Sequence, residues 1–159
     1  MGGGSVYSGR LAGAGRAESI FRSAVQEIAQ LPTRKVRNVF ISFHIDDEPQ
    51  VNLLREQARN EKYNLEFRDY SVKEPFDERW KSSCRERIAQ TSATICMIGR
   101  YTASREAVIW ELEESYAQGK LVIGVRISRD REDPVPRPLR EHNAPIVDWN
   151  LDEISRLLE

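Results

Sequence analysis

Cysteine is nearly absent from this sequence, which contains only Cys84 and Cys96 among its 159 residues. That number is far below the density of a secreted disulfide scaffold, and the spacing matches no common metal site. The sequence therefore argues against an extracellular, disulfide-stabilised protein. We expect two buried thiols in a reducing cytoplasm.

Long apolar runs and an excess of one charge are also absent. No segment approaches the roughly 20 apolar residues of a membrane-spanning helix, and the N-terminus lacks the basic-then-apolar layout of a signal peptide. The 24 basic side chains are balanced by 25 acidic ones, so no broad field attracts nucleic acid or an anionic membrane. These absences predict a soluble, cytoplasmic protein with no nucleic acid and no membrane as partners.

The phosphate-binding motifs GxGxxG and the P-loop are missing as well. The chain does have the length for one compact domain, since 159 residues can bury roughly two thirds of the surface that the unfolded chain exposes. Residues 1–16 are glycine-rich and poor in large apolar side chains, which predicts a flexible segment. Residues 17–31 carry apolar side chains at helical spacing, which predicts an amphipathic helix. We expect this helix to pack on the main domain, residues 34–159, or on a second copy.

From residue 34 onward, β-branched and aromatic runs alternate with helical patterns. The predicted strands are 36–43, 63–70, 93–98, 121–127 and 144–149. Strands joined through helices pair in parallel by right-handed crossovers. We therefore expect an α/β three-layer sandwich with a flavodoxin-like five-stranded parallel sheet of order 2-1-3-4-5. Ligands of such sheets bind beyond the carboxyl ends of the strands, which places the loops after Phe43 and Phe67 and the segment before Glu111 around one crevice.

Glu111 is the main candidate for a functional residue. It lies in a predicted helix, residues 104–118, where Ser104, Ala107 and Ser115 share its face at spacings of seven, four and four. Because these neighbours are small, we expect a ligand to reach the carboxylate. The alternative is that Glu111 is one of several solvent-facing acids on this helix.

Four phrases of the sequence, taken in order, resemble a TIR domain. They are VFISFH at 39–44, FRDYS at 67–71, IAQTS leading into ICMIG at 88–99, and WELE at 110–113. More narrowly, they are similar to the bacterial TIR-like proteins of Thoeris antiphage defence. The resemblance covers about residues 34–148 and leaves the N-terminal helix unexplained.

The resemblance implies an enzyme that cleaves NAD+ between nicotinamide and ribose, with Glu111 at the position of the family's catalytic glutamate. In the defence proteins, the ADP-ribose portion is released as a cyclic signal after infection is sensed, and this nucleotide acts on a separate effector protein. NAD+ is then the substrate, and no metal or other cofactor is implied. A homo-oligomer is expected because family active sites are often completed by neighbouring copies. The choice between hydrolysis and cyclisation is left open by the sequence.

The resemblance also implies substrate-binding residues around Glu111. After the first strand these are Phe43, His44 and Asp47, for which the alternatives are a core position, solvent exposure and a capping role. After the second strand they are Asp69 and Ser71, which are equally compatible with a turn whose side chains bond to its own backbone.

Two further candidates lie near the helix of Glu111. Ser104 shares its predicted face and is assigned to substrate binding. Trp110 matches the family phrase but lies about 100° round the helix from Glu111. It is therefore also compatible with a contact between protomers.

Other uses of this fold fit less well. A phosphorelay receiver needs an aspartate at the end of the third strand and a lysine at the end of the fifth, where this chain has Gly99 and Asp148-Trp149. A flavodoxin needs a hydroxyl-rich phosphate loop after the first strand, whereas Asp46 and Asp47 would repel phosphate. The remaining alternative is a non-catalytic TIR-like signalling module that acts by self-association or partner docking.

Overall fold

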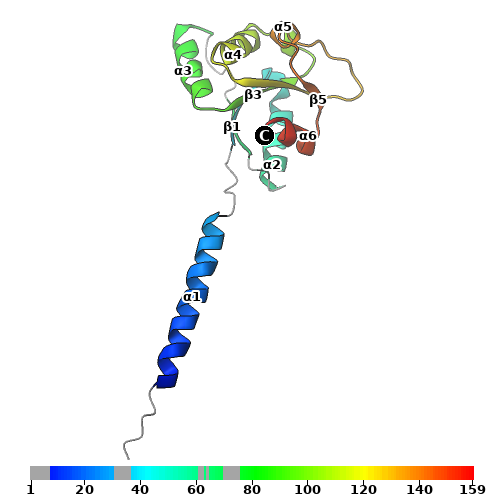
Figure 1. Cartoon of the computed structure of the whole chain (residues 1–159). Coiled ribbons are helices and arrows are strands. Elements are labelled where there is room, and N and C mark those ends of the chain that lie inside the picture. The colour runs from blue at the N-terminus through cyan, green and yellow to red at the C-terminus, as the bar shows by residue number, and fades with distance from the viewer. Residues whose placement is uncertain (1–7, 31–36, 61–62, 64, 70–75) are drawn as a thin grey trace, which may run out of the picture. The chain divides into compact units, whose positions relative to one another are not determined.

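The computed structural model describes the backbone of residues 8–30, 37–60, 63, 65–69 and 76–159. Side chains are described for residues 15–27, 37–60, 63, 65–67 and 76–159. By its internal contacts the chain divides into two units, Met1–Arg34 and Lys35–Glu159 (Figure 1). Each unit is considered by itself.

The first unit contains one helix, α1, Ser8–Gln30. It begins nine residues before the expected start at Ala17, inside the segment predicted to be flexible. Arginine, leucine and alanine residues between positions 10 and 17 are strong helix formers and offset the cost of the two glycines there. Among the described residues of this unit, no second element covers the apolar side chains of the helix. Ile20 and Phe21 are 67% and 71% exposed.

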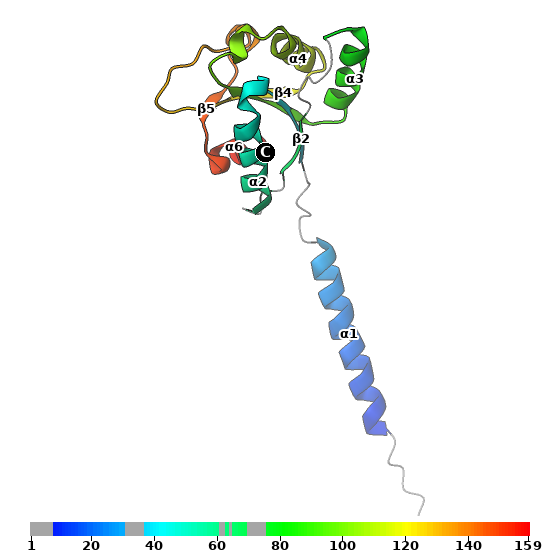
Figure 2. The same ribbon diagram turned by 180° about the vertical axis from the view of Figure 1, so that it is seen from behind.

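The second unit is a five-stranded sheet with helices on both faces (Figures 1 and 2). Its strands are β1 Arg37–Ser42, β2 Leu65–Asp69, β3 Ala93–Ile98, β4 Leu121–Arg126 and β5 Ile146–Asp148. All described pairings are parallel, and the strand order is β2-β1-β3-β4-β5. The predicted α/β, flavodoxin-like architecture is therefore confirmed.

The helices of this unit connect successive strands, except α6, which follows the last strand. They are the 3-10 turn η1 Ile45–Asp47, α2 Glu48–Asn60, α3 Glu78–Ala89, the 3-10 turn η2 Thr102–Ser104, α4 Glu106–Ala117, α5 Arg137–Glu141 and α6 Leu151–Leu157. The short helix α5 lies in the proline-rich stretch between β4 and β5. Pro138 is tolerated there because an N–H in the first turn of a helix has no intrahelical partner.

Alternating side chains of each strand fill two separate core layers. One layer holds Val39 and Ile41 of β1 together with residues of α2 and α6. On the opposite face, Phe40 packs with α3 and α4, whereas Ile98 of β3 and Val122 of β4 pack with α4 and α5. The period-two alternation of a strand explains why neighbouring residues of β1 belong to different layers. Ser42, at the end of β1, therefore faces the same layer as Phe40.

Helix α4 is fixed at both ends by local backbone structure. Arg105, in an extended conformation, separates it from η2. At the other end Gly119 has a φ of 71°, and the N–H groups of Gly119 and Lys120 donate to the carbonyls of Tyr116 and Ser115 at 2.9 and 3.0 Å. This arrangement is a Schellman motif, with Gly119 at its left-handed position.

Candidate active site at the carboxyl edge of the sheet

Glu111 lies on the side of α4 that faces the sheet. Ala107, Glu111 and Ser115 are all buried on this helix. Ser104 is not part of their face, because it belongs to η2, is exposed, and donates its hydroxyl to the carbonyl of Tyr101 at 3.0 Å. The helix that the sequence predicted from residue 104 is thus interrupted at Arg105, and Ser104 points to its own turn.

The carboxyl group of Glu111 is covered, with only 2% of the residue exposed. Ser42, which is fully buried at the end of β1, donates its hydroxyl to Oε2 of Glu111. The expectation of an open, ligand-accessible carboxylate is therefore wrong for this structure. Small residues beside Glu111 do not leave it open, since they let α4 approach the sheet closely enough for its acid to meet β1.

A second set of hydrogen bonds fixes the backbone of α4 at Glu111. The hydroxyl of Ser115 donates to the carbonyl of Glu111 at 2.8 Å. The same hydroxyl lies 2.8 Å from that of Thr94 on β3. Both side chains are buried, so these bonds form without competition from bulk water. Glu111 is held from β1 through its side chain and from β3 through its main chain.

Burial also changes the acidity of this carboxyl group. Desolvation raises the pKa of Glu111 to about 8, and the hydrogen bond from Ser42 and the charge of Arg105 only partly offset it. Removal from water disfavours the charged form of an acid, whereas a donor or a nearby cation favours it. At neutral pH the group is therefore mainly protonated. A shift of this size is typical of functional carboxyl groups and is also found in structural ones.

The loop after β1 brings a second group of polar residues to the same edge of the sheet. The backbone N–H of Asp46 donates to Nδ1 of His44 at 3.1 Å, so His44 caps the 3-10 turn. The ring of His44 lies 5.8 Å from that of Tyr101, between centroids. Phe43 is 7% exposed and belongs to the core. Of the two neighbours predicted to bind substrate, only His44 is accessible here.

Asp47 ends this turn with its carboxylate against Gly99, the residue that follows β3. A Cβ atom at position 99 would lie 2.2 Å from Oδ2 of Asp47. Burial raises the pKa of Asp47, the charges of Asp46 and Asp133 raise it further, and those of His44 and Arg131 lower it. The glycine therefore provides the space in which this acid rests.

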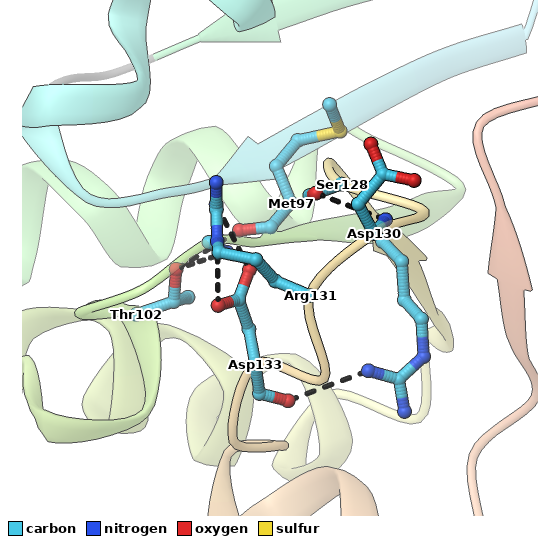
Figure 3. A network of polar contacts seen from close by, with 8 residues as sticks. Met97, Thr102, Ser128, Asp130, Arg131 and Asp133 are labelled. Atoms are coloured by element: carbon cyan, nitrogen blue, oxygen red, sulfur yellow. Dashed lines mark hydrogen bonds and ion pairs between the residues drawn. The ribbon is translucent and has the colours of Figure 1, made fainter.

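Figure 3 shows the loop after β4 at the same edge. Arg131 forms two hydrogen bonds with the carboxylate of Asp133, each of 3.2 Å. The carbonyl of Asp133 accepts a bond of 3.3 Å from Arg126 at the end of β4. These contacts draw residues 126–133 together beside the ends of β3 and β4. Sequence reasoning missed them because the loop has no periodic pattern, and an arginine two residues from an aspartate was the only signal.

The turn after β3 is stabilised by hydrogen bonds to the side chain of Thr102. The hydroxyl of Thr102 accepts the N–H of Gly99 at 2.8 Å and donates to the carbonyl of Met97 at 3.2 Å (Figure 3). Thr102 is fully buried. This buried hydroxyl satisfies two backbone groups that the end of the strand leaves unpaired, and it fixes the path of the chain toward α4.

The remaining predicted residues are placed as follows. Asp69 ends β2, where its backbone pairs with Ile41 of β1. Its side chain and all of Ser71 lie outside the described residues. Trp110 is half-buried in an aromatic cluster, with ring centroids 5.3 Å from Trp80 and 6.4 Å from Phe76. Within the chain, Trp110 therefore packs on α3 and faces away from Glu111.

A hollow of about 400 Å³ lies beside the end of β4 and helix α5. Its walls include Ala103 of η2 and the three arginines Arg126, Arg137 and Arg140. Glu111 is not among its lining residues. Arg137 is already paired with Glu113 at 2.6 Å and with Glu141 at 3.0 Å. The buried carboxyl and this hollow are thus two distinct features of the unit.

The two cysteines are buried, as the sequence predicts. Cys84 and Cys96 are buried free thiols, and burial raises the pKa of both. Trp80 is a core residue, 6% exposed. His142 is exposed and stacks on Tyr116 with ring centroids 3.7 Å apart.

The fold is that of a TIR domain. Among solved structures, the chain is similar to the TIR domain of the Toll-related receptor TRR-2 from Hydra magnipapillata, with 16% identity and a TM-score of 0.50 over 74% of this chain and 87% of that one. A second similar structure contains the TIR domains of the activated Roq1 resistosome that recognises the pathogen effector XopQ, with 18% identity and a TM-score of 0.42 over 57% of each chain. At this identity the first likeness shows the fold alone.

The comparison of the sequence with family models identifies a more specific family than the fold does. The family model of the Thoeris protein ThsB, TIR-like domain, matches residues 40–132. The chain therefore belongs to the Thoeris ThsB TIR-like family, as its motifs suggested. No curated protein sequence matches the chain.

The described residues contain neither a candidate metal site nor a helix that could span a membrane. Among them, no three His, Cys, Asp or Glu side chains are grouped so that they could hold a metal ion. The helices within the described ranges include none that is both long and apolar enough to cross a lipid bilayer.

Proposed function

We propose that this protein cleaves the bond between nicotinamide and ribose in NAD+, with Glu111 as the catalytic residue. The observation that supports the proposal is the acid itself. In a member of the Thoeris TIR-like family, Glu111 is buried at the carboxyl edge of a parallel sheet and bonded to the last residue of β1. Open parallel sheets bind their ligands at this edge.

One carboxyl group is sufficient for this chemistry. Most glycosidases need a second, protonated carboxyl group because an alkoxide is a poor leaving group. Nicotinamide leaves NAD+ as a neutral molecule and needs no proton. Positive charge develops at the anomeric carbon as the bond breaks, and a fixed carboxylate stabilises it most where water is excluded. Glu111 meets that condition because it is 2% exposed.

The raised pKa of Glu111 fits this role if the substrate ionises the group. NAD+ brings a cationic pyridinium, and a nearby positive charge lowers the pKa of an acid. Binding would therefore favour release of the proton from a group whose pKa burial has raised to about 8. A ligand must also displace the contacts that now cover the carboxyl group, so we propose that the site opens when NAD+ binds.

The wider biological role follows from the family. We propose that the ADP-ribose portion is released as a cyclic or hydrolysed product in antiphage defence, and that this nucleotide acts on a separate effector protein. Which product forms depends on the nucleophile held nearest the anomeric carbon, since positioning alone contributes several kcal/mol. We further propose a cytoplasmic homo-oligomer in which neighbouring copies complete or open the site.

The test is release of nicotinamide from NAD+ by the full chain. We expect turnover by the wild type and a loss of about a hundredfold or more in Glu111→Gln. Glu113→Gln is the matched control, because Glu113 lies on the same helix but is half-exposed in a surface pair with Arg137. Such a pair contributes at most about 1 kcal/mol. Lysate of infected cells, with and without the wild-type protein, would show whether a trigger is needed for a new nucleotide to appear.

A non-catalytic signalling module is the second candidate. One observation favours it, since Glu111 is almost fully buried and does not line the hollow beside β4 and α5. In that case a triggered protein would leave NAD+ intact, and Glu111→Gln would signal as well as the wild type. Measuring nicotinamide and signalling in the same cells separates the two candidates.

A further inference from the structure

Ser42 is the partner of the Glu111 side chain. It is the last residue of β1 and is fully buried, and its backbone pairs with Cys96 of β3 in the middle of the sheet. Its hydroxyl donates to Oε2 of Glu111. No motif assigned a role to this serine, which the sequence shows only as the polar residue within an otherwise apolar strand end.

The hydroxyl of Ser42 is directed at the carboxyl group of Glu111. A serine hydroxyl carries one proton, and here the proton is directed at a carboxyl oxygen. A buried bond of this kind with an ionised acid is short and strong. Because β1 is an inner strand paired on both sides, Ser42 cannot move away without disturbing the sheet. The bond therefore fixes one carboxyl oxygen of Glu111.

We propose that Ser42 is a positioning residue for Glu111, which orients the carboxyl group toward the substrate and stabilises its ionised form. The inference rests on the proposed NAD+ cleavage for its catalytic meaning, but the coupling between the two side chains is independent of that function. Ser42 touches no reacting atom in this scheme. Its effect on the reaction passes through Glu111.

Removing the hydroxyl should shift the ionisation of Glu111 in one direction. The bond from Ser42 lowers the pKa of Glu111, while burial raises it. In Ser42→Ala the burial remains and the donor is lost, so the pKa must rise. A hydrogen bond to a charged group corresponds to a shift of about one to two pH units.

A neighbouring hydroxyl supplies the matched control. Thr94 on β3 is also fully buried and also links the sheet to α4, but through Ser115 and not through the carboxyl group of Glu111. Thr94→Val removes this hydroxyl with little change in volume. Both variants therefore lose one buried hydrogen bond between the sheet and α4, and only Ser42→Ala loses the donor to the acid.

The experiment is titration of the Glu111 carboxyl group in the full chain by NMR of carboxyl-labelled glutamate, assigned with Glu111→Gln. We expect the midpoint of Ser42→Ala to lie about one to two pH units above that of the wild type, and that of Thr94→Val to be unchanged. Ser42→Thr, which keeps a hydroxyl, should have a midpoint close to that of the wild type. An unchanged midpoint in Ser42→Ala, or an equal shift in Thr94→Val, would overturn the inference.

Kinetics distinguish this inference from the proposed function. We expect Ser42→Ala to lower kcat about ten- to a hundredfold with little change in KM. The rising limb of the plot of kcat against pH should move to higher pH by the same amount as the NMR midpoint. Absence of nicotinamide release from the triggered wild type, with the NMR shift present, would refute NAD+ cleavage and leave the coupling intact. Release that is unaffected in Ser42→Ala would refute the positioning role and leave the proposed function intact.

Discussion

The carboxylate of Asp47 occupies the space in which a side chain at Gly99 would begin. A Cβ atom there would lie 2.2 Å from Oδ2 and 2.7 Å from Cγ of Asp47. Gly99→Ala must therefore displace Asp47, and we expect a loss of about 1–2 kcal/mol in unfolding free energy, as is typical of overpacking. Chemical denaturation of both proteins measures it.

A double-mutant cycle attributes this loss to the contact. In an Asp47→Ala background the clash disappears, so Gly99→Ala should cost less than half as much. An equal cost in both backgrounds would show that Gly99 is needed for another reason.

The buried acid predicts a stability that depends on pH. Burial raises the folded-state pKa of Glu111 to about 8, compared with 4.5 for a solvated glutamate, so between these pH values the folded state keeps a proton that the unfolded state has lost. The free energy of unfolding contributed by this group is therefore fully present below pH 4.5 and is lost as pH rises through 8. The whole difference is of the order of 5 kcal/mol.

Glu111→Gln removes this dependence because an amide does not titrate. We expect the variant to gain stability relative to the wild type when denaturation is measured at pH 9 rather than pH 5. Glu113→Gln, at a half-exposed position, should follow the wild type. If the wild type and Glu111→Gln respond to pH in parallel, the carboxyl group is not held protonated by the fold.

Trp110 is predicted to contribute to stability through its aromatic neighbours. It contacts Trp80 and Phe76, and Arg85 lies over its ring at 5.3 Å from the centroid. Trp110→Ala should lower the unfolding free energy by about 2–3 kcal/mol, because both packing and edge-to-face contacts are lost. Tyr101→Ala, at a residue that is 54% exposed, should cost less than about 1 kcal/mol. Similar losses of unfolding free energy in the two variants would argue against a stabilising role for the aromatic cluster.

The N-terminal unit is predicted to affect association more than folding. All three core clusters lie within Lys35–Glu159, so a chain that begins at Lys35 should unfold cooperatively with little change in midpoint. Helix α1 carries the exposed apolar residues Ile20, Phe21 and Val25. We expect light scattering to give a larger mass for the full chain, in protomer equivalents, than for the shortened one. Equal numbers of protomers would assign α1 another role.

The sequence predicts the architecture better than it predicts the site. The alternation of strand and helix patterns specifies parallel pairing, and the resemblance places Glu111 at the carboxyl edge of the sheet. The periodicity of one helix does not say what covers its face. The small residues Ala107 and Ser115 fit an open cleft and a close helix-sheet contact equally well, and the structure has the second. Ser42 was missed for the same reason, since only the packed sheet shows which strand meets the acid.

The most direct measurement for the central claim is the pH dependence of kcat/KM for nicotinamide release between pH 6 and 9, because this parameter reports ionisations of the free enzyme. If the ionised Glu111 carries the reaction, the value rises with pH and reaches half of its plateau near pH 8, the pKa that burial gives this group. A profile that is flat or falls across this range, or one that Glu111→Gln reproduces, would contradict the assignment of Glu111 as the catalytic residue.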